Sequence, residues 1–143
     1  METLLDRVYG VDEVEVIALD LKKLLPRCSI MTFQGSLGAG KTTLVRSLLR
    51  SCGIKEVITS PTFTYVNSYE NDKGDSFYHF DCYRLVSAQA FLDEGFDEYL
   101  YKHQSWAFIE WPEVIESLLK TGVCTVILDY EGSESRHIKV LLS

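Results

Sequence analysis

The stretch GSLGAGKTT, residues 35–43, constrains the fold of this chain more than any other segment. Its three glycines and its lysine follow a mostly apolar run at residues 30–33 and precede a segment, 44–49, whose apolar residues recur at helical spacing. Residues 35–42 match the pattern G-x-x-x-x-G-K-[ST] at every fixed position. The order predicted here is therefore a buried strand, a glycine loop and an amphipathic helix.

The glycine loop has the residue types that bind the phosphates of a nucleotide. Glycines let successive backbone N–H groups turn inward around a phosphate. Lys41 can then reach the β- and γ-phosphates, the Thr42 hydroxyl can bind Mg²⁺, and the N-terminus of the next helix adds partial positive charge. We therefore predict a Walker A site for ATP and Mg²⁺. The predicted binding residues are Gly35, Ser36, Leu37, Gly38, Ala39, Gly40, Lys41, Thr42 and Thr43.

Two carboxylates stand where apolar runs end. Asp81 follows the run at residues 77–80, and Glu110 follows the run at 107–109. Ligands of an open α/β sheet gather at the ends of its strands. Either carboxylate could hold Mg²⁺, directly or through water, while the other polarises the attacking water. The residues themselves leave that division open.

The hydroxyl-rich segment at residues 59–62 precedes the next predicted strand, and Thr62 could belong to a switch loop that closes over the γ-phosphate; an ordinary proline turn is the alternative. Trp111 could stack on a ligand or pack at a strand end. His79 is given no catalytic role, because on a strand it could lie in the core, at the surface or near the site.

Length and composition favour one domain over residues 1–143, with 46% hydrophobic and 24% charged residues. No stretch approaches the roughly 20 apolar residues of a membrane span, and the N-terminus lacks the pattern of a secretory signal. We expect a cytoplasmic protein without membrane attachment, whose four cysteines are buried and reduced. A net charge of −7 argues against strong nucleic-acid binding by the chain alone.

Apolar periodicity predicts a mixed α/β domain. Asp12, with Glu15 three residues later, predicts a capping box at the first helix. A turn at residues 71–74 makes the second and third strands a β-hairpin. Predicted helices cover 11–25, the segment after the glycine loop, 87–92, 96–101 and 112–119; predicted strands cover 29–33, 62–69, 76–81, 107–109, 123–129 and 137–142. The expected fold is a three-layer P-loop NTPase sandwich with a mixed parallel and antiparallel sheet and a β-hairpin insertion.

Five segments in this order resemble the TsaE family, also called the YjeE family: GSLGAGKTTL, SPTFTYVNSYE, YHFDCYRL, GFDEYL and IEWPE. The resemblance covers about residues 10–131, and HFDCYRL followed by IEWPE is its most specific part. Ser36, Tyr65 and Cys82 differ from residues common in the family, and none of these differences removes a predicted phosphate or metal ligand.

The resemblance implies a small ATPase that acts with the TsaB and TsaD proteins in tRNA threonylcarbamoyladenosine synthesis. Such an ATPase hydrolyses ATP slowly alone and supports repeated turnover, while TsaD carries the transfer chemistry and tRNA is met through the complex. Lys41 would then bind phosphates, Thr42 and Glu110 would bind Mg²⁺, Asp81 would act at the hydrolytic centre, and Thr62 would belong to the switch loop.

Three other functions compete with this interpretation. A GTPase needs an N-K-x-D element, and the nearest stretch, residues 71–75, has the wrong spacing. A small-molecule kinase usually has an arginine-bearing lid, and only Arg84 and Arg136 follow the helix of the glycine loop. A binding module that uses ATP occupancy without hydrolysis would have the same loop, so the sequence alone leaves it open.

Overall fold

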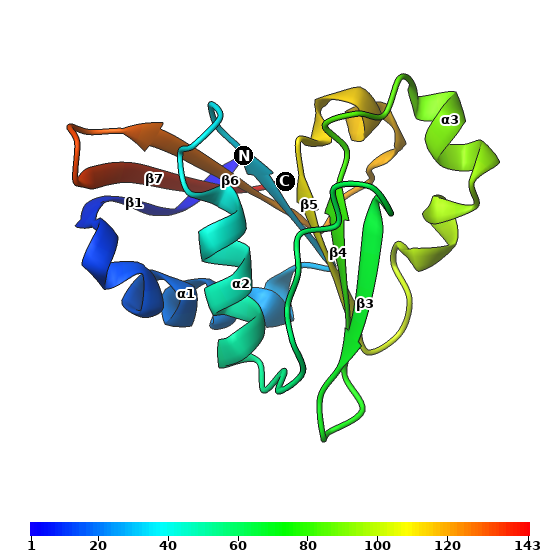
Figure 1. Cartoon of the computed structure of the whole chain (residues 1–143), viewed down its shortest axis with the longest axis horizontal. Helices are drawn as coiled ribbons and strands as arrows, with labels where there is room; N and C mark the ends of the chain where they lie inside the picture. Colours follow the sequence, from blue (N-terminus) through cyan, green and yellow to red (C-terminus); the bar gives the residue numbers. More distant parts are fainter.

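A single seven-stranded sheet runs through the computed structural model, which describes residues 1–143. Its strand order is β1-β7-β6-β2-β5-β4-β3 (Figure 1). The strands are β1 (Glu2–Gly10), β2 (Ile30–Gln34), β3 (Val66–Glu70), β4 (Ser76–Asp81), β5 (Ser105–Glu110), β6 (Val123–Tyr130) and β7 (Ser135–Leu142). Strand β2, which precedes the glycine loop, and strand β5, which ends at Glu110, are neighbours near the centre of the sheet.

The sheet is mixed, as predicted. Strand β2 pairs in parallel with β5 and β6, and β4 pairs in parallel with β5. The pairs β1–β7, β6–β7 and β3–β4 are antiparallel, and β3–β4 is the predicted hairpin. Because parallel strands end at the same edge, β2, β4, β5 and β6 deliver their carboxyl ends to one side of the molecule.

Helices cover both faces of the sheet (Figure 1). The α-helices are α1 (Val14–Lys22), α2 (Lys41–Ser51) and α3 (Ala88–Asp93); the 3₁₀ helices are η1 (Val11–Glu13), η2 (Leu25–Arg27), η3 (Phe96–Tyr99) and η4 (Pro112–Leu118). Helices α1 and α2 lie against each other over the larger of two buried apolar clusters. The smaller cluster includes Phe91, Phe96 and Ile115 from α3, η3 and η4. These layers confirm the three-layer sandwich.

Local patterns explain the central elements. Strand β2 is apolar at three of its five positions, and residues 30–33 are all buried, as expected of a strand covered on both faces. In α2 the predicted stripe Leu44, Val45, Leu48 and Leu49 is fully buried. The predicted loop therefore does connect a buried strand to an amphipathic helix.

One strand was missed by the sequence analysis, and two local predictions were wrong. Strand β1 was not predicted, because its sequence carries charges at several positions and its stability comes from pairing with the distant β7. The start of the first helix is stabilised by Glu13, whose carboxylate accepts the Gly10 N–H at 2.8 Å, so Asp12 and Glu15 form no capping box. Strand β3 starts at Val66 rather than at residue 62, because Tyr65 adopts a left-handed backbone with φ of 67°.

Strand β5, which lies beside the central strand β2, offers a test of the core. Phe108 is 0% exposed and packs against Phe77 and Phe33, with ring centroids 5.9 and 6.4 Å away. We expect Phe108→Ala to lower the free energy of unfolding by about 3–5 kcal/mol, because it removes a fully buried ring and leaves a cavity. Phe63 is 80% exposed, so the control Phe63→Ala should change it by less than about 0.5 kcal/mol. Urea unfolding of both variants measures the difference; equal losses would contradict this packing.

Candidate functional site

The glycine loop takes a backbone conformation that two of its glycines make possible. Gly35 has φ of +151°, and a Cβ atom there would collide with the carbonyl oxygen of Leu128 on β6. Gly40 has φ of +102° and is the left-handed residue from which α2 begins. The loop therefore lies close against β6 and turns sharply into the helix, as a phosphate-binding loop must.

Lys41 turns back onto its own loop. Its ammonium donates hydrogen bonds to the carbonyl oxygens of Gly35 and Ser36, the latter at 3.1 Å, and lies 3.7 Å from the ring centroid of Trp111. The residue is only 5% exposed. Desolvation lowers the pKa of the Lys41 ammonium from its ordinary value, and the negative charge of Glu110 is the largest of those that oppose this. A positive charge is thus held within the loop, where phosphate oxygens could replace the carbonyls as its partners.

The hydroxyl of Thr42 meets Glu110 directly. Thr42 Oγ1 donates to Glu110 Oε1 at 2.6 Å, across the interface between α2 and the end of β5. Glu110 is 2% exposed, and its other oxygen, Oε2, lies 2.5 Å from Nε2 of His79 on β4. The structure therefore brings two of the predicted metal ligands together without an intervening residue.

Asp81 lies beside this pair. The parallel register places it opposite Glu110 on the neighbouring strand, and its Oδ1 accepts the Tyr83 N–H at 3.0 Å. Desolvation raises the pKa of the Asp81 carboxyl from its ordinary value, and the negative charge of Glu110 adds to that rise. Two acidic side chains thus end adjacent strands at the edge where the glycine loop begins.

The donor atoms at this edge suit Mg²⁺. They are one hydroxyl and two carboxylates, all hard oxygen ligands. No group of three or more His, Cys, Asp or Glu side chains in the chain could hold a metal ion by itself. A Mg²⁺ ion bound with a nucleotide needs only one or two protein oxygens, because phosphates and waters complete its shell. The residues present therefore fit Mg²⁺ carried together with phosphates.

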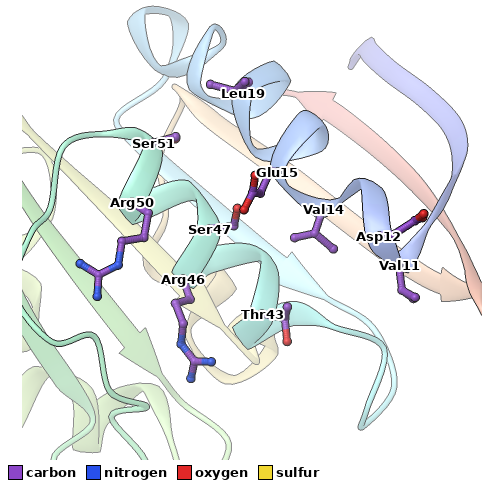
Figure 2. Close-up of a pocket in the computed structure, with 10 residues that line it drawn as sticks. All are labelled: Val11, Asp12, Val14, Glu15, Leu19, Thr43, Arg46, Ser47, Arg50 and Ser51. Atoms are coloured by element: carbon purple, nitrogen blue, oxygen red, sulfur yellow. The ribbon is translucent and has the colours of Figure 1, made fainter.

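A hollow of about 630 Å³ adjoins the glycine loop. It lies between α1 and α2, with Val11 and Val14 facing Thr43 and Ser47 (Figure 2). The wall is completed by Asp12, Glu15, Leu19, Arg46, Arg50 and Ser51. Its volume is in the usual range for small-molecule sites. Because Thr43 lies in the first turn of α2, the hollow begins next to the predicted phosphate position.

The rest of the glycine loop is tied to the sheet. The carbonyl of Leu37 accepts the hydroxyl of Tyr130 at 3.2 Å, although the Leu37 side chain is 71% exposed. The carbonyl of Ala39, a buried residue, accepts Nε of Arg136 at 3.2 Å. These bonds hold the loop through its carbonyls, and they also give Arg136 a structural role instead of one in a lid.

Thr62 is the predicted site residue that the structure does not connect to the others. Its hydroxyl lies 3.0 Å from the Ser60 hydroxyl. The same segment reaches the site at its other end, since the carbonyl of Tyr65 accepts the N–H of Asp81 at 3.0 Å. A switch role for Thr62 would thus require the segment to move.

Two residues at the site went unassigned in the sequence. His79 contacts Glu110, and the signal that could have located it is strand alternation: it precedes Asp81 by two residues and so shares its face. Trp111 has a left-handed backbone with φ of 54°, packs against Tyr83 with ring centroids 4.7 Å apart and a tilt of 44° between the rings, and covers Lys41. Nothing in the pattern of the chain signals that strained backbone.

The stretch compared with a guanine-binding element has a structural use. Oδ1 of Asn71 accepts the N–H groups of Lys73 and Asp75, and its Nδ2 donates to the carbonyl of Cys52. This side chain closes the hairpin turn and anchors it to the end of α2.

The four cysteines are all buried and free, as predicted. None of the helices has the length and apolar character that a membrane span requires.

This chain is similar to known proteins over most of its length. The family model described as "Threonylcarbamoyl adenosine biosynthesis protein TsaE" matches residues 9–138. The TsaE protein of Bacillus subtilis (strain 168) is 32% identical over 138 residues, which cover 96% of this chain and 85% of that protein. The TsaE protein of Treponema pallidum (strain Nichols) is 39% identical over 118 residues, covering 82% and 85%. The crystal structure of Bacillus subtilis YdiB matches with a TM-score of 0.72 at 25% identity, covering all of this chain and 89% of that one.

The raised pKa of Asp81 predicts a pH-dependent effect on stability. A folded pKa above the unfolded one gives stability that is present below the unfolded pKa and lost as the pH rises through the folded pKa. The ionised carboxylate, close to Glu110, therefore destabilises the free protein at neutral pH, and neighbouring Lys41 and His79 offset this only in part. Asp81→Asn keeps an acceptor for Tyr83. We expect it to raise the melting temperature at pH 7, in EDTA, by about 1–3 °C.

That gain should disappear when the pH falls below about 4, where the wild-type carboxyl is itself protonated. Calorimetric melting of both proteins from pH 3.5 to 7 measures it. A variant that is less stable than the wild type at pH 7 but equal at pH 3.5 would contradict the assigned direction.

Proposed function

This chain belongs to the TsaE family, and on that basis we propose that it is the ATP-binding and slowly ATP-hydrolysing component of tRNA N6-threonylcarbamoyladenosine synthesis. The coarse part, a nucleotide-binding protein of that biosynthesis, follows from the family and the P-loop fold. The finer part is ATP and Mg²⁺ as cofactors and hydrolysis as the reaction. The observation that carries it is the direct hydrogen bond from Thr42 to Glu110, at 2.6 Å, next to Lys41.

Each residue has a role in this proposal that its position supports. Lys41 would exchange its carbonyl partners for the β- and γ-phosphate oxygens. Thr42 and Glu110 would hold Mg²⁺, which supplies charge neutralisation on the phosphates when bound. Asp81 would orient and polarise the attacking water from the adjacent strand. Thr62 would approach from the switch segment once nucleotide is bound.

The geometry supports one of the two divisions of labour between the acids. Glu110 is buried and already hydrogen-bonded to the other proposed metal ligand, Thr42, whereas Asp81 is half-buried and bonds only to a backbone N–H of its own loop. A carboxylate that bonds the P-loop threonine lies on the metal side of the site. The more accessible Asp81 is better placed to meet a water molecule.

The proposal includes partners and place. TsaB and TsaD would join this chain in the modifying complex, with tRNA met through them, and the work would be done in the cytoplasm. A net charge of −7 supports indirect contact with tRNA, because a chain with net negative charge repels the phosphates of a nucleic acid. We further propose that residues 1–143 act as one ATPase domain, since every strand belongs to one sheet.

The hollow between α1 and α2 is where the nucleoside would lie. Val11→Trp, at a residue that is 47% exposed, should fill its mouth and weaken ATP binding about tenfold, or about 1.4 kcal/mol. Binding of inorganic tripolyphosphate should stay within about twofold, because the loop is unchanged. Lys41→Ala should weaken the binding of both ATP and tripolyphosphate. Isothermal titration with each ligand measures these effects.

The matched control for this test is Val16→Trp, a substitution at 49% exposure that does not line the hollow. It should change neither affinity. Equal loss of ATP binding in Val11→Trp and Val16→Trp, or loss of tripolyphosphate binding in Val11→Trp, would contradict the placement of the nucleoside.

The proposed function is tested by two measurements made in parallel. ATP hydrolysis is followed for the chain alone and with TsaB, TsaD and substrate tRNA, while modified adenosine is counted. We expect modification to require this chain. We expect Asp81→Ala to lower the rate of ATP hydrolysis at least about 100-fold while ATP still binds. Modification that persists in Asp81→Ala without hydrolysis would instead support a binding module that uses ATP occupancy. Tight ATP binding with no effect on modification would favour a small-molecule kinase.

A further inference from the structure

His79 occupies a place that the proposed reaction leaves without a function. It lies on β4, is 1% exposed, and its Nε2 is 2.5 Å from Glu110 Oε2. The register pairs His79 with Phe108 and Asp81 with Glu110, so all four side chains share the face of the sheet that α2 covers. The imidazole is thus fixed by the sheet, directly beside the carboxylate proposed to hold the metal.

The hydrogen bonds around the ring identify the direction of this contact. Nδ1 of His79 is buried and has no hydrogen-bond partner. A buried N–H without an acceptor is rarer and costlier than a buried nitrogen lone pair without a donor. The ring proton therefore belongs on Nε2, from which it is donated to Glu110 Oε2. Since Thr42 donates to Oε1, each oxygen of the carboxylate accepts one bond.

Two donors on the two oxygens fix the plane of a carboxylate, and they differ in kind here. Thr42 is in the first turn of α2, next to the glycine loop, and its hydroxyl is itself a proposed metal ligand. His79 lies within a paired strand, and its side chain makes its one hydrogen bond to Glu110. The imidazole is therefore the donor whose position does not depend on what the loop binds.

We infer that His79 is a positioning residue: its Nε2–H holds the Glu110 carboxylate in the orientation in which Glu110 binds the divalent cation. This inference rests on the proposed metal site. Hydrogen-bond partners of carboxylate ligands typically change metal affinity by about 10- to 100-fold when removed. His79 thus acts on the metal through Glu110 and leaves phosphate binding by the loop untouched.

The test compares ADP binding with Mn²⁺ and in EDTA, by calorimetry, in the full-length chain. Mn²⁺ stands in for Mg²⁺ as a cation that prefers oxygen ligands. The wild type is expected to bind ADP more tightly with Mn²⁺. His79→Leu removes the donor and should lose about tenfold of that gain, with ADP affinity in EDTA within about twofold of the wild type. His79→Gln carries an amide N–H at the reach of Nε2 and should restore most of the gain.

His137→Leu is the matched control. His137 also pairs with a carboxylate, Asp6, at 2.6 Å, but on the face of the sheet opposite to α2. It should leave the gain from Mn²⁺ unchanged within about twofold, the scatter expected of a substitution that touches no ligand of the metal. A folded His79→Leu that keeps the full gain would overturn the positioning role alone. A wild type that binds ADP but gains nothing from Mn²⁺ would overturn the proposed metal site as well.

A second measurement needs no variant and holds if His79→Leu does not fold. Nitrogen NMR of the ¹⁵N-histidine-labelled wild type reports which ring nitrogen carries the proton. We expect the Nε2–H tautomer for His79. Its ring resonance should shift between a sample with ADP alone and a sample with ADP and Mg²⁺, which is used here because it is diamagnetic and Mn²⁺ is not. An Nδ1–H tautomer would overturn the inference, since Nε2 would then have no proton to donate to Glu110.

Discussion

The parallel pairing of β2 with β5 is the constraint on which the site depends. It sets Phe33, the last residue of β2 that pairs with β5, opposite Glu110, the last residue of β5. The loop then has to leave the sheet beside a carboxylate, and the first turn of α2 brings Thr42 onto that carboxylate. The pairing of β4 with β5 adds Asp81 and His79 by the same geometry. Four candidate site side chains thus lie together because three strands end in register.

The site contains buried charges of both signs. Lys41 and Glu110 are nearly inaccessible to water, and Asp81 is half-buried next to them. The Lys41 ammonium donates its hydrogen bonds to loop carbonyls, while the two carboxylates accept hydrogen bonds from a hydroxyl, an imidazole and a backbone N–H. Buried charges of this kind are poorly compensated by each other and better compensated by a ligand that brings both signs. A phosphate chain with its divalent cation has that composition.

Prediction from the sequence succeeded where the signal is local. The spacing of the glycine loop, the apolar stripe of α2 and the hairpin turn at residues 71–74 each depend on neighbours a few positions apart, and all three are present. It failed where stability comes from distant partners. Strand β1 exists because β7 pairs with it, and the segments predicted as helices at residues 96–101 and 112–119 are 3₁₀ turns held by tertiary packing.

By itself, the sequence determined that a glycine loop with the spacing of a phosphate-binding loop lies between a strand and a helix, and that acids end two other strands. Residue type and short-range spacing are enough for both, because glycine conformation and strand alternation are local properties. The tertiary structure alone decided which acid meets Thr42, that His79 stands behind Glu110, and that Trp111 covers Lys41. Those contacts join residues up to 70 positions apart on different elements, and the register of the sheet together with the docking of α2 determines them.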